Sequence, residues 1–400
     1  MNLIKVSWKN IQHKPLNTGL SLLLLAFGVG IISLLLLVEV QLKNQFDRNI
    51  KNIDMVLGAK GSPLQLILSS VYQVDAPTGN INYSEAQRIA KSPFVEKSIP
   101  LAYGDNFKSY RIVGTTHDYV DHYDAKLESG SLWSGEFEAT IGSKVATAEG
   151  LEVGDTFYSA HGLEDTTDVH KDKAFTVVGI FESSGTVVDQ LVLTGMESIW
   201  GVHESHDHEA GAEHDHQHEE DREITAMFLK VRNKMALFSI PKQLEDSKIQ
   251  TVLPSVEINR LNEGFGIGMG TLRVIAIAIM VLSFVSVFIS LYNSLRERKY
   301  ELALMRSMGG TRSTLFRLIL QEGLLLAILG FVIGIVLSRI GLLILSHYMA
   351  ENFHYSLNQI GMVSGEFWML LITIFVGVLA SLLPAYRAMK IDIAKTLSNE

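Results

Sequence analysis

Four long runs of uncharged, mostly apolar residues stand out from the pattern of apolar and polar positions along this 400-residue chain. They cover residues 20–38, 274–291, 323–338 and 367–383, and Pro384 stops the fourth. A helix of about 20 apolar residues is long enough to cross a lipid bilayer. We therefore predict four transmembrane helices.

The first run raises the alternative of a cleaved signal peptide, because Lys5, Lys9 and Lys14 precede it. Its apolar part is too long for a signal peptide, and no small-residue cleavage site follows it. We expect the run to remain in the chain as an uncleaved first span.

Positive charges orient the four spans. The segment between the second and third spans, 295–317, holds six Lys or Arg residues, whereas the segment between the third and fourth, 347–365, holds none. The tail adds Arg387, Lys390 and Lys395. Because Lys and Arg mark the cytoplasmic side of a membrane protein, we place both termini and 295–317 in the cytoplasm and 43–270 outside.

The outer region has the mixed pattern of a soluble α+β domain. SEAQRIAKS begins with a serine cap before a helical run, and five segments have strand composition between turn residues. VQLKNQFDRNIKNI continues the first span as a helix with a polar face. A segment near 256–272 leads into the second span, although Gly264, Gly266, Gly268 and Gly270 weaken it as a helix. The five strand segments are YRIVGTT, EATIGSK, AFTVVGIF, QLVLTG and AMFLKV.

The predicted fold is a membrane protein of α+β class, with four transmembrane helices and a large α+β extracytoplasmic domain between the first two. The domain covers 43–270 and includes stalk helices and a histidine-rich loop at 203–221. The predicted spans are 19–42, 271–294, 318–346 and 366–386. The other segments are a cytoplasmic N-terminal segment (1–18), a cytoplasmic coupling helix and loop (295–317), an outer loop (347–365) and a cytoplasmic tail (387–400).

Composition and motifs exclude several classes of function. The net charge of −9 gives no basic footprint for nucleic acid, and the absence of cysteine excludes disulfides and thiolate metal sites. GAKGSP (58–63) lacks the spacing of a phosphate-binding loop, and GGTRST (309–314) lacks its lysine. We find no Ser-His-Asp or paired-carboxylate cluster, so we expect a non-catalytic chain.

The segment 203–221 is the most unusual in composition. It holds eight acidic residues and six of the 13 histidines. Neutral imidazole with carboxylates suits Zn²⁺, Ni²⁺ or Cu²⁺, but the segment offers several equivalent ligand sets. Three interpretations remain open: a solvated acidic loop that binds metal incidentally, a loop that captures or senses zinc, and a pH sensor. The candidate metal ligands are His203, His206, His208, His214, His216 and His218.

Two charged residues lie in or beside the third span. Arg339 is inside it, near the outer end, and Glu322 is at the inner end. A charge at this depth is stable only if it faces protein or reaches the membrane surface. Its position near the end favours a side chain of Arg339 that extends to the interface, and Glu322 is open to the same interpretation.

The segment 296–325 predicts a charged helix inside the cell, a break at Gly309 and Gly310, and a restart at Ser313 towards the third span. Its apolar face fits a soluble partner; the alternative is a helix lying on anionic lipid. The residues of this face are Leu302, Leu304, Met305 and Met308.

Two motifs in this chain resemble those of permeases of the MacB/FtsX/LolC type. Gly310 and Ile393 depart mildly from the family pattern, where alanine and proline are usual. The first motif is carried by Arg298, Glu301, Leu304, Arg306, Gly309 and Glu322, and the closing motif by Pro384, Ala385, Arg387, Ala388, Asp392 and Leu397.

The resemblance implies a permease subunit of an ABC transporter in a bacterial inner membrane. It also implies a homodimer, a partner ATPase subunit that binds and hydrolyses ATP in the cytoplasm, and motion transmitted to a domain in the periplasm. No cofactor is expected in this chain, apart from Zn²⁺ at the histidine-rich loop if the permease handles metal. The ATPase-coupling residues would be Arg298, Glu301, Leu304, Arg306 and Gly309.

Other functions fit the same resemblance. One alternative is a metal-independent permease for lipoprotein extraction or for peptide or drug efflux. Another is a regulatory complex that activates a periplasmic partner protein. The sequence does not choose among these functions.

Overall fold

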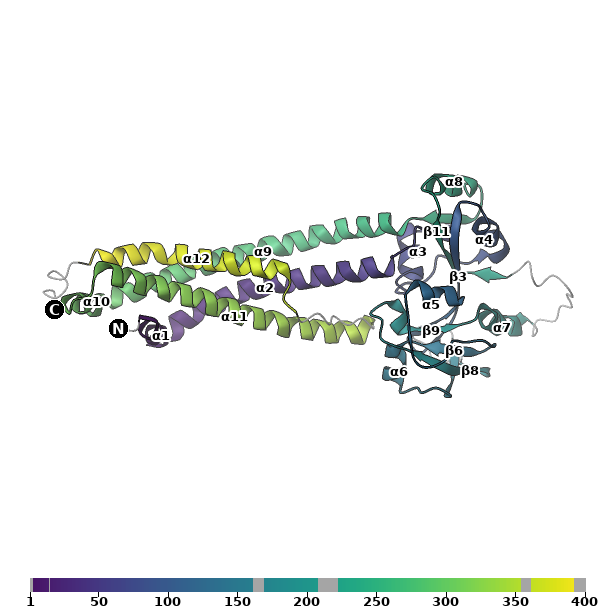
Figure 1. Cartoon of the computed structure of the whole chain (residues 1–400), viewed down its shortest axis with the longest axis horizontal. Coiled ribbons are helices and arrows are strands. Elements are labelled where there is room, and N and C mark those ends of the chain that lie inside the picture. Colours follow the sequence, from purple (N-terminus) through teal and green to yellow (C-terminus); the bar gives the residue numbers. More distant parts are fainter. Residues whose placement is uncertain (1–2, 14, 161–168, 208–221, 354–360, 392–400) are drawn as a thin grey trace. The chain divides into compact units, whose positions relative to one another are not determined.

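The computed structural model describes residues 3–13, 15–160, 169–207, 222–353 and 361–391 (Figure 1). The chain forms two compact units: Met1–Leu42 with Gly264–Glu400, called the membrane unit here, and Lys43–Glu263, called the outer unit. The predicted fold class is confirmed: among the described residues, four helices are long and apolar enough to cross a membrane, and a mixed α/β unit lies between the first and second of them in the sequence.

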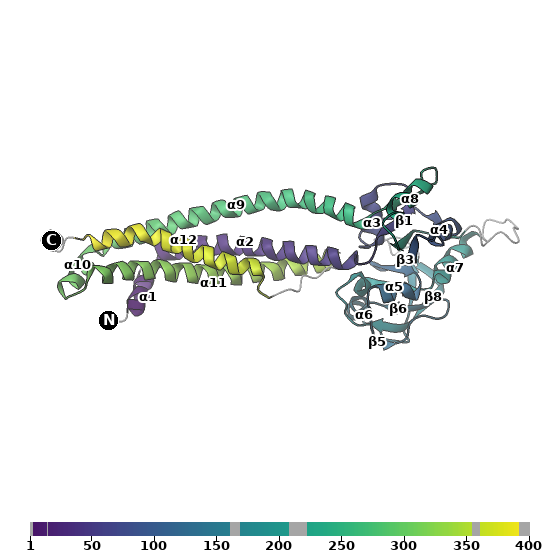
Figure 2. The ribbon, with the colours of Figure 1, turned by 45° about the horizontal axis from the view of Figure 1, so that its top comes forward.

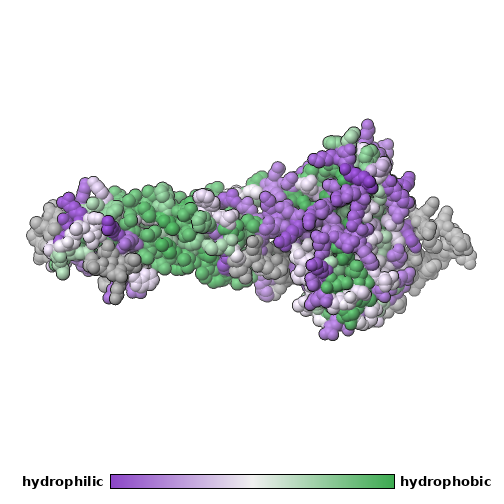
Figure 3. Space-filling view, viewed as in Figure 1, coloured by the Kyte–Doolittle hydropathy of each residue, from purple (hydrophilic) through white to green (hydrophobic). Residues whose placement is uncertain are grey.

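Long helices make up the membrane unit. Two of them, α2 and α9, extend beyond it into the residues of the outer unit. Hydrophobic side chains form a continuous band over the helices of this unit (Figure 3), as contact with lipid requires. The helices are α1 (Leu3–His13), α2 (Pro15–Asn49), α9 (Pro254–Glu297), α10 (Lys299–Ser307), α11 (Arg312–Phe353) and α12 (Ser364–Met389).

One helix prediction needs correction. The run 367–383 was expected to stop at Pro384, yet α12 continues through this buried proline to Met389. Proline is tolerated in membrane helices because neighbouring groups satisfy the freed backbone. The glycines at 264–270 lie within α9 without interrupting it, and the expectation that they weaken this helix stays a prediction.

The outer unit alternates short strands and helices, as the sequence pattern predicts. All five segments predicted as strands contain strand residues, and SEAQRIAKS lies in and just after a helix. Its elements are β1 (Met55–Ala59), α3 (Pro63–Ser70), β2 (Ile81–Asn82), α4 (Tyr83–Ala90), β3 (Val95–Phe107), β4 (Tyr110–Gly114), α5 (His117–His122), β5 (Leu127–Gly130), β6 (Glu138–Ile141), α6 (Ser143–Glu149), β7 (Thr156–Ala160), β8 (Val169–Phe181), η1 (Val187–Gln190), β9 (Leu191–Thr194), α7 (Met196–Asp207), β10 (Glu223–Ile224), β11 (Ala226–Val231), α8 (Ala236–Gln243) and β12 (Ile249–Val252).

Within the described residues, ten strands form one mixed sheet with the order β12-β1-β11-β3-β4-β9-β6-β8-β5, and β7 pairs with β3 and β8 (Figures 1 and 2). The β4–β9 and β6–β8 pairs are parallel. Successive side chains of a strand point to opposite faces, so the sheet separates two cores. Met55 and Leu57 of β1 enter one core, and Val56 enters the other.

Candidate functional site

The short helix α10 is anchored on one side by apolar contacts inside the membrane unit. Leu302 and Ala303 are buried there. They belong to one cluster with Leu315 and Leu318 of α11 and Ala385 of α12. Burial of this side fixes α10 against the ends of two membrane-spanning helices.

The opposite side of α10 leaves large apolar side chains in contact with solvent. Tyr300 is 44% exposed, Leu304 45% and Met308 81%. The face predicted from the sequence is therefore divided, because Leu302 packs inward whereas Leu304 and Met308 point outward. Glu301 is also exposed. An exposed apolar surface of this kind on a short helix is typical of a site that binds another protein.

A glycine turn ends α10 and sets the direction of α11. Gly309 has φ +98°, a left-handed conformation that favours glycine, and the N–H of Gly310 donates to Met305 O at 3.0 Å. Thr311 Oγ1 then accepts from the N–H of Thr314 at 3.2 Å, which caps the start of α11. The predicted break between the two helices lies here.

Arg306 ties α10 to the chain that follows α12. Its Nη1 donates to Ile391 O at 2.8 Å, and Ile391 is itself largely buried. Arg306 thus has a structural contact within this chain, in addition to the partner contact predicted for it.

A buried ion pair, called the inner pair, joins the start of α10 to α11. Arg298 Nη2 lies 3.1 and 3.2 Å from the two carboxylate oxygens of Glu322, and Asn10 of α1 donates to the same carboxylate at 2.6 Å. The side chains of Arg298 and Glu322 are only 11% and 3% exposed. Glu322 therefore faces protein and does not extend to the interface.

A second buried ion pair, called the outer pair, joins α11 to α12. Arg339 contacts both carboxylate oxygens of Glu366 at 2.8 Å, and Glu366 is fully buried. Ser33 of α2 donates to the same carboxylate at 2.5 Å, and its hydroxyl oxygen lies 2.8 Å from that of Ser338. The prediction that Arg339 extends to the membrane surface is wrong, because its charge is neutralised inside the protein.

Buried pairs of this kind are costly to break. The free energy of unfolding falls by about 3–5 kcal/mol when one partner of a buried pair is removed, because the other charge stays buried and unpaired. The two pairs therefore hold the helices together only as intact pairs. Neither pair was predicted from the sequence.

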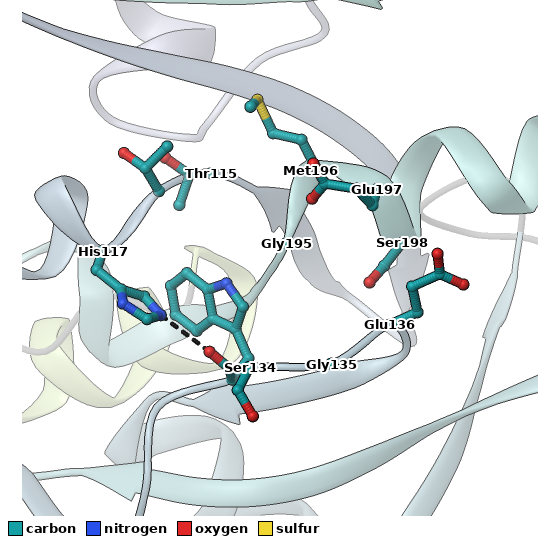
Figure 4. A pocket seen from close by; sticks show the side chains of 11 residues that line it. Thr115, His117, Ser134, Gly135, Glu136, Gly195, Met196, Glu197 and Ser198 are labelled. Atoms are coloured by element: carbon teal, nitrogen blue, oxygen red, sulfur yellow. Dashed lines mark hydrogen bonds between the residues drawn. The ribbon is translucent and has the colours of Figure 1, made fainter.

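The outer unit contains a surface cleft of about 400 Å³ (Figure 4). Trp133 and Met196 contribute apolar surface, and the carboxylates of Glu136 and Glu197 lie on the side away from His117. Thr115 Oγ1 donates to a backbone carbonyl at 2.8 Å, and an imidazole nitrogen of His117 lies 2.9 Å from Trp133 O. Both of these side chains already have partners, whereas the buried Oγ1 of Thr116, which also lines the cleft, has none among the described residues.

The loop at the edge of this cleft is closed by a carboxylate. Glu138 Oε2 accepts from the backbone N–H groups of Ser134 at 2.7 Å and Gly135 at 2.8 Å. These two hydrogen bonds hold the pKa of Glu138 below its usual value. Glu138 therefore stabilises the loop in its ionised form.

The candidate metal ligands fall mostly outside the part of the chain that the structure describes. His203 and His206 lie in α7, where the backbone is helical, whereas His208, His214, His216 and His218 lie outside the described residues. Among the residues that are described, no three His, Asp or Glu side chains form a group that could hold a metal ion.

Two family models match the sequence. The MacB-like periplasmic core domain matches residues 18–246, which is more than half of the chain, and the FtsX-like permease C-terminal domain matches residues 273–393. A comparison with curated proteins gave no match.

Solved structures give weaker likenesses. The periplasmic region of MacB from Actinobacillus actinomycetemcomitans is 12% identical, with 54% of this chain and 96% of that chain covered and a TM-score of 0.35. The extracellular domain of the noncanonical ABC-type transporter YknZ from Gram-positive bacteria is 11% identical, with 50% and 98% covered and a TM-score of 0.31. At these TM-scores the family assignment rests on the family models.

Both matches agree with the order of features along the chain. The periplasmic core model spans most of α2 and most of the outer unit. The permease model spans α10, α11, α12 and most of the membrane-spanning part of α9. The four spans and the domain between the first two fit a multi-pass inner-membrane protein with its large domain in the periplasm. Permeases of this family work with a separate cytoplasmic ABC ATPase subunit and often dimerise. The chain therefore belongs to the MacB/FtsX-type family of ABC transporter permeases.

Proposed function

We propose that this permease transmits motion from a cytoplasmic ATPase to its periplasmic domain, and that ATP is bound and hydrolysed by the ATPase alone. Two copies of the permease would bind two ATPase subunits. The proposal is carried by one observation: α10 exposes Tyr300, Leu304 and Met308 while Leu302 and Ala303 fix it to α11 and α12. A helix fixed on one side and apolar on the other is suited to receive a force from a partner.

The contacts of α10 define a path for that force. Arg298 passes it to α11 through Glu322, and Arg306 passes it to the segment after α12 through Ile391. Helices α2 and α9 then continue without interruption into residues of the periplasmic domain. Mechanical coupling through these helices needs no passage for substrate between the spans.

The docking face is tested by placing a charge on it. We expect Leu304→Asp to lower the amount of the cognate ATPase that co-purifies with the permease by about 10- to 100-fold, because burial of a leucine contributes about 1.5–3 kcal/mol. Leu304 is exposed in the permease, so the variant should fold and insert normally. Gln12→Asp is the matched control, since it adds the same charge at an exposed position of α1.

Two results would contradict this proposal. Undiminished binding of the ATPase by Leu304→Asp would place the docking surface elsewhere. An equal loss in Gln12→Asp would show that negative charge on the cytoplasmic side, not loss of the apolar face, weakens the complex.

A role in zinc handling is the more specific proposal, and it rests on the composition of 203–221. Six histidines among eight acidic residues in a periplasmic segment are typical of weak metal binding through shifting ligand sets. Ligating imidazoles must be unprotonated, so zinc affinity should fall as the pH drops through about 6.5.

The zinc proposal is tested by calorimetry and by growth. Replacing His206, His208, His214, His216 and His218 together should abolish zinc binding by the full chain, whereas replacing His206 alone should change it little. If the five-fold variant also supports normal growth under zinc limitation and zinc excess, the segment binds metal without using it. The alternatives would then stand: metal-independent lipoprotein extraction, peptide or drug efflux, or activation of a periplasmic partner.

A further inference from the structure

The outer pair forms a buried polar cluster that joins three helices within the hydrophobic part of the membrane unit. Ser33 of α2 lies five residues inside the outer end of the uncharged run 20–38, about 7.5 Å at 1.5 Å per residue. Its hydroxyl bonds to Glu366 of α12, which is held by both nitrogens of the Arg339 guanidinium of α11. The backbone N–H of Val363 also donates to Glu366, at 3.0 Å. One carboxylate thus connects α2, α11 and α12.

Glycines bring the same three helices into close contact. A Cβ atom built on Gly334 of α11 would lie 2.6 Å from Val29 Cγ1 and 2.8 Å from Ala26 O of α2. A Cβ atom built on Gly377 of α12 would lie 2.5 Å from the Cβ of Ala327 of α11. No larger side chain fits without movement of a helix, so the packing of α2, α11 and α12 is tight on both sides of α11.

Helix α9 is attached to this group in a different way. At its periplasmic end, Arg273 pairs with Glu39 of α2 at 2.5 Å, but each side chain is about half exposed. Further in, Ser286 and Ser21 form a hydrogen bond of 2.9 Å. At the opposite end, Arg298 of the inner pair directly follows α9, and Val287 and Leu291 of α9 are buried in one cluster with Leu326 of α11 and Ala380 of α12.

We propose that Ser33, Arg339 and Glu366 are positioning residues that hold α2, α11 and α12 as one rigid body, so that α9 is the helix that moves relative to them when ATP binds to the complex. The buried carboxylate and the close glycine contacts carry this inference independently of each other. It rests on the proposed function in one respect, since ATP must drive a motion of the permease for α9 to move.

The test uses spin-label distances in the full complex of permease and ATPase. The chain contains no cysteine, so labels can be placed at Ile344 of α11, Trp368 of α12 and Val274 of α9, which are 67%, 66% and 67% exposed. Labelled copies are diluted with unlabelled ones so that distances within one chain are measured. We expect the distance 344–368 to stay unchanged when ATP is added, and the distance 344–274 to shift by several ångströms.

Three variants separate positioning from general stability. Glu366→Gln keeps a hydrogen-bonding side chain but removes the charge, and it should broaden the 344–368 distribution. Arg339→Lys keeps the charge but loses the bidentate contact with Glu366, so it should broaden the 344–368 distance distribution less than Glu366→Gln does. Glu39→Gln removes the exposed pair and should leave 344–368 unchanged. ATP hydrolysis and monodispersity of each complex show that it remains folded.

The outcomes distinguish this proposal from the proposed function. A 344–368 distance that changes with ATP, or that is unaffected by Glu366→Gln in a folded complex, overturns the rigid body. If neither distance responds to ATP although the ATPase is bound and active, mechanical transmission itself is wrong, and with it the motion of α9. In that case the effect of Glu366→Gln on 344–368 still decides whether the cluster positions the three helices.

Discussion

Helices α2 and α9 both contain residues of the membrane unit and of the periplasmic domain. They differ in how closely other helices approach Gly28 and Gly30 of α2 and the four glycines at 264–270 of α9. A Cβ atom on Gly30 of α2 would lie 3.1 Å from Gly334 O of α11. In α9, Gly264 and Gly268 would each place a Cβ atom in open space, and so would the two glycines between and after them. Gly28 and Gly30 thus allow close packing of α2 on α9 and α11, whereas Gly19 of α2 and the four glycines of 264–270 have no neighbour within 4 Å in this chain.

This difference has a mechanical consequence. Glycine in a helix costs roughly 1 kcal/mol relative to alanine, and in α2 the close contact with α11 offsets that cost. The segment 264–270 of α9 has four glycines, and none of them has a close contact in this chain that offsets the cost. Residues 39–49 of α2 contain no glycine. We infer that α2 is a stiff connection to the periplasmic domain and that α9 is a soft one.

The largest expected effect comes from breaking the inner pair, whose arginine directly follows α9. Glu322→Ala leaves the Arg298 guanidinium buried without its carboxylate, and it should lower the free energy of unfolding by about 3–5 kcal/mol. Denaturant unfolding of the purified full chain in detergent measures this. Glu301→Ala, an exposed glutamate of α10, is the control and should change little. A similarly small change in Glu322→Ala would mean that the inner pair does not hold the start of α10 to α11.

Stiffening α9 is the next largest change. Replacing Gly264, Gly266, Gly268 and Gly270 together with alanine should stabilise this part of the helix by roughly 3–4 kcal/mol, at about 1 kcal/mol per glycine. None of the four has a positive φ, so alanine fits the backbone. Backbone amides of 264–272 should then exchange with deuterium more slowly. If their exchange does not slow, the glycines do not soften the helix.

The same substitution in α11 should act in the opposite direction. Gly334→Ala would bring a Cβ atom within 2.8 Å of a backbone oxygen of α2, and overpacking of this kind costs about 1–3 kcal/mol. Gly268→Ala in α9 is the matched variant and should be neutral or stabilising. Thermal unfolding of both variants shows whether each substitution raises or lowers the stability. If both substitutions change the stability in the same direction, the two helices do not differ in how their glycines pack.

The smallest effect is expected at the pair between α2 and α9. Glu39 and Arg273 are each about half exposed, so Glu39→Gln should lower the free energy of unfolding by less than about 1 kcal/mol. A loss comparable with that of Glu322→Ala would show that α9 is firmly held at its periplasmic end as well. That result would contradict the inference that α9 is the more flexible connection to the periplasmic domain.

Much of this architecture follows from the sequence. Uncharged runs predict the four spans because the bilayer admits few charges, and alternating segments predict the strands AMFLKV and QLVLTG, which form β11 and β9. The break at Gly309 was visible because glycine supplies the left-handed residue that ends α10. The local sequence pattern is therefore enough to predict spans, strands and helix ends, because these depend on residues close together in the chain.

The buried pairs depend on contacts that local pattern does not contain. Arg339 and Glu366 are separated by 27 residues, and Arg298 and Glu322 by 24. Opposite charges at the ends of consecutive spans were a usable signal, because antiparallel neighbours bring those ends together. The sequence also did not show which apolar residues of α10 are buried. Leu302 and Leu304 have the same side chain, and only the packing of Leu302 on α11 and α12 distinguishes them.

Hydrogen–deuterium exchange of the full chain tests the central contrast most directly. The Glu39–Arg273 pair marks a common point on the two helices, so amides 40–48 of α2 and 264–272 of α9 are the segments to compare. Four glycines weaken α9 by roughly 3–4 kcal/mol, so its amides should exchange about 100-fold faster or more. Equal rates, or slower exchange in α9, would contradict the account of a stiff α2 and a soft α9.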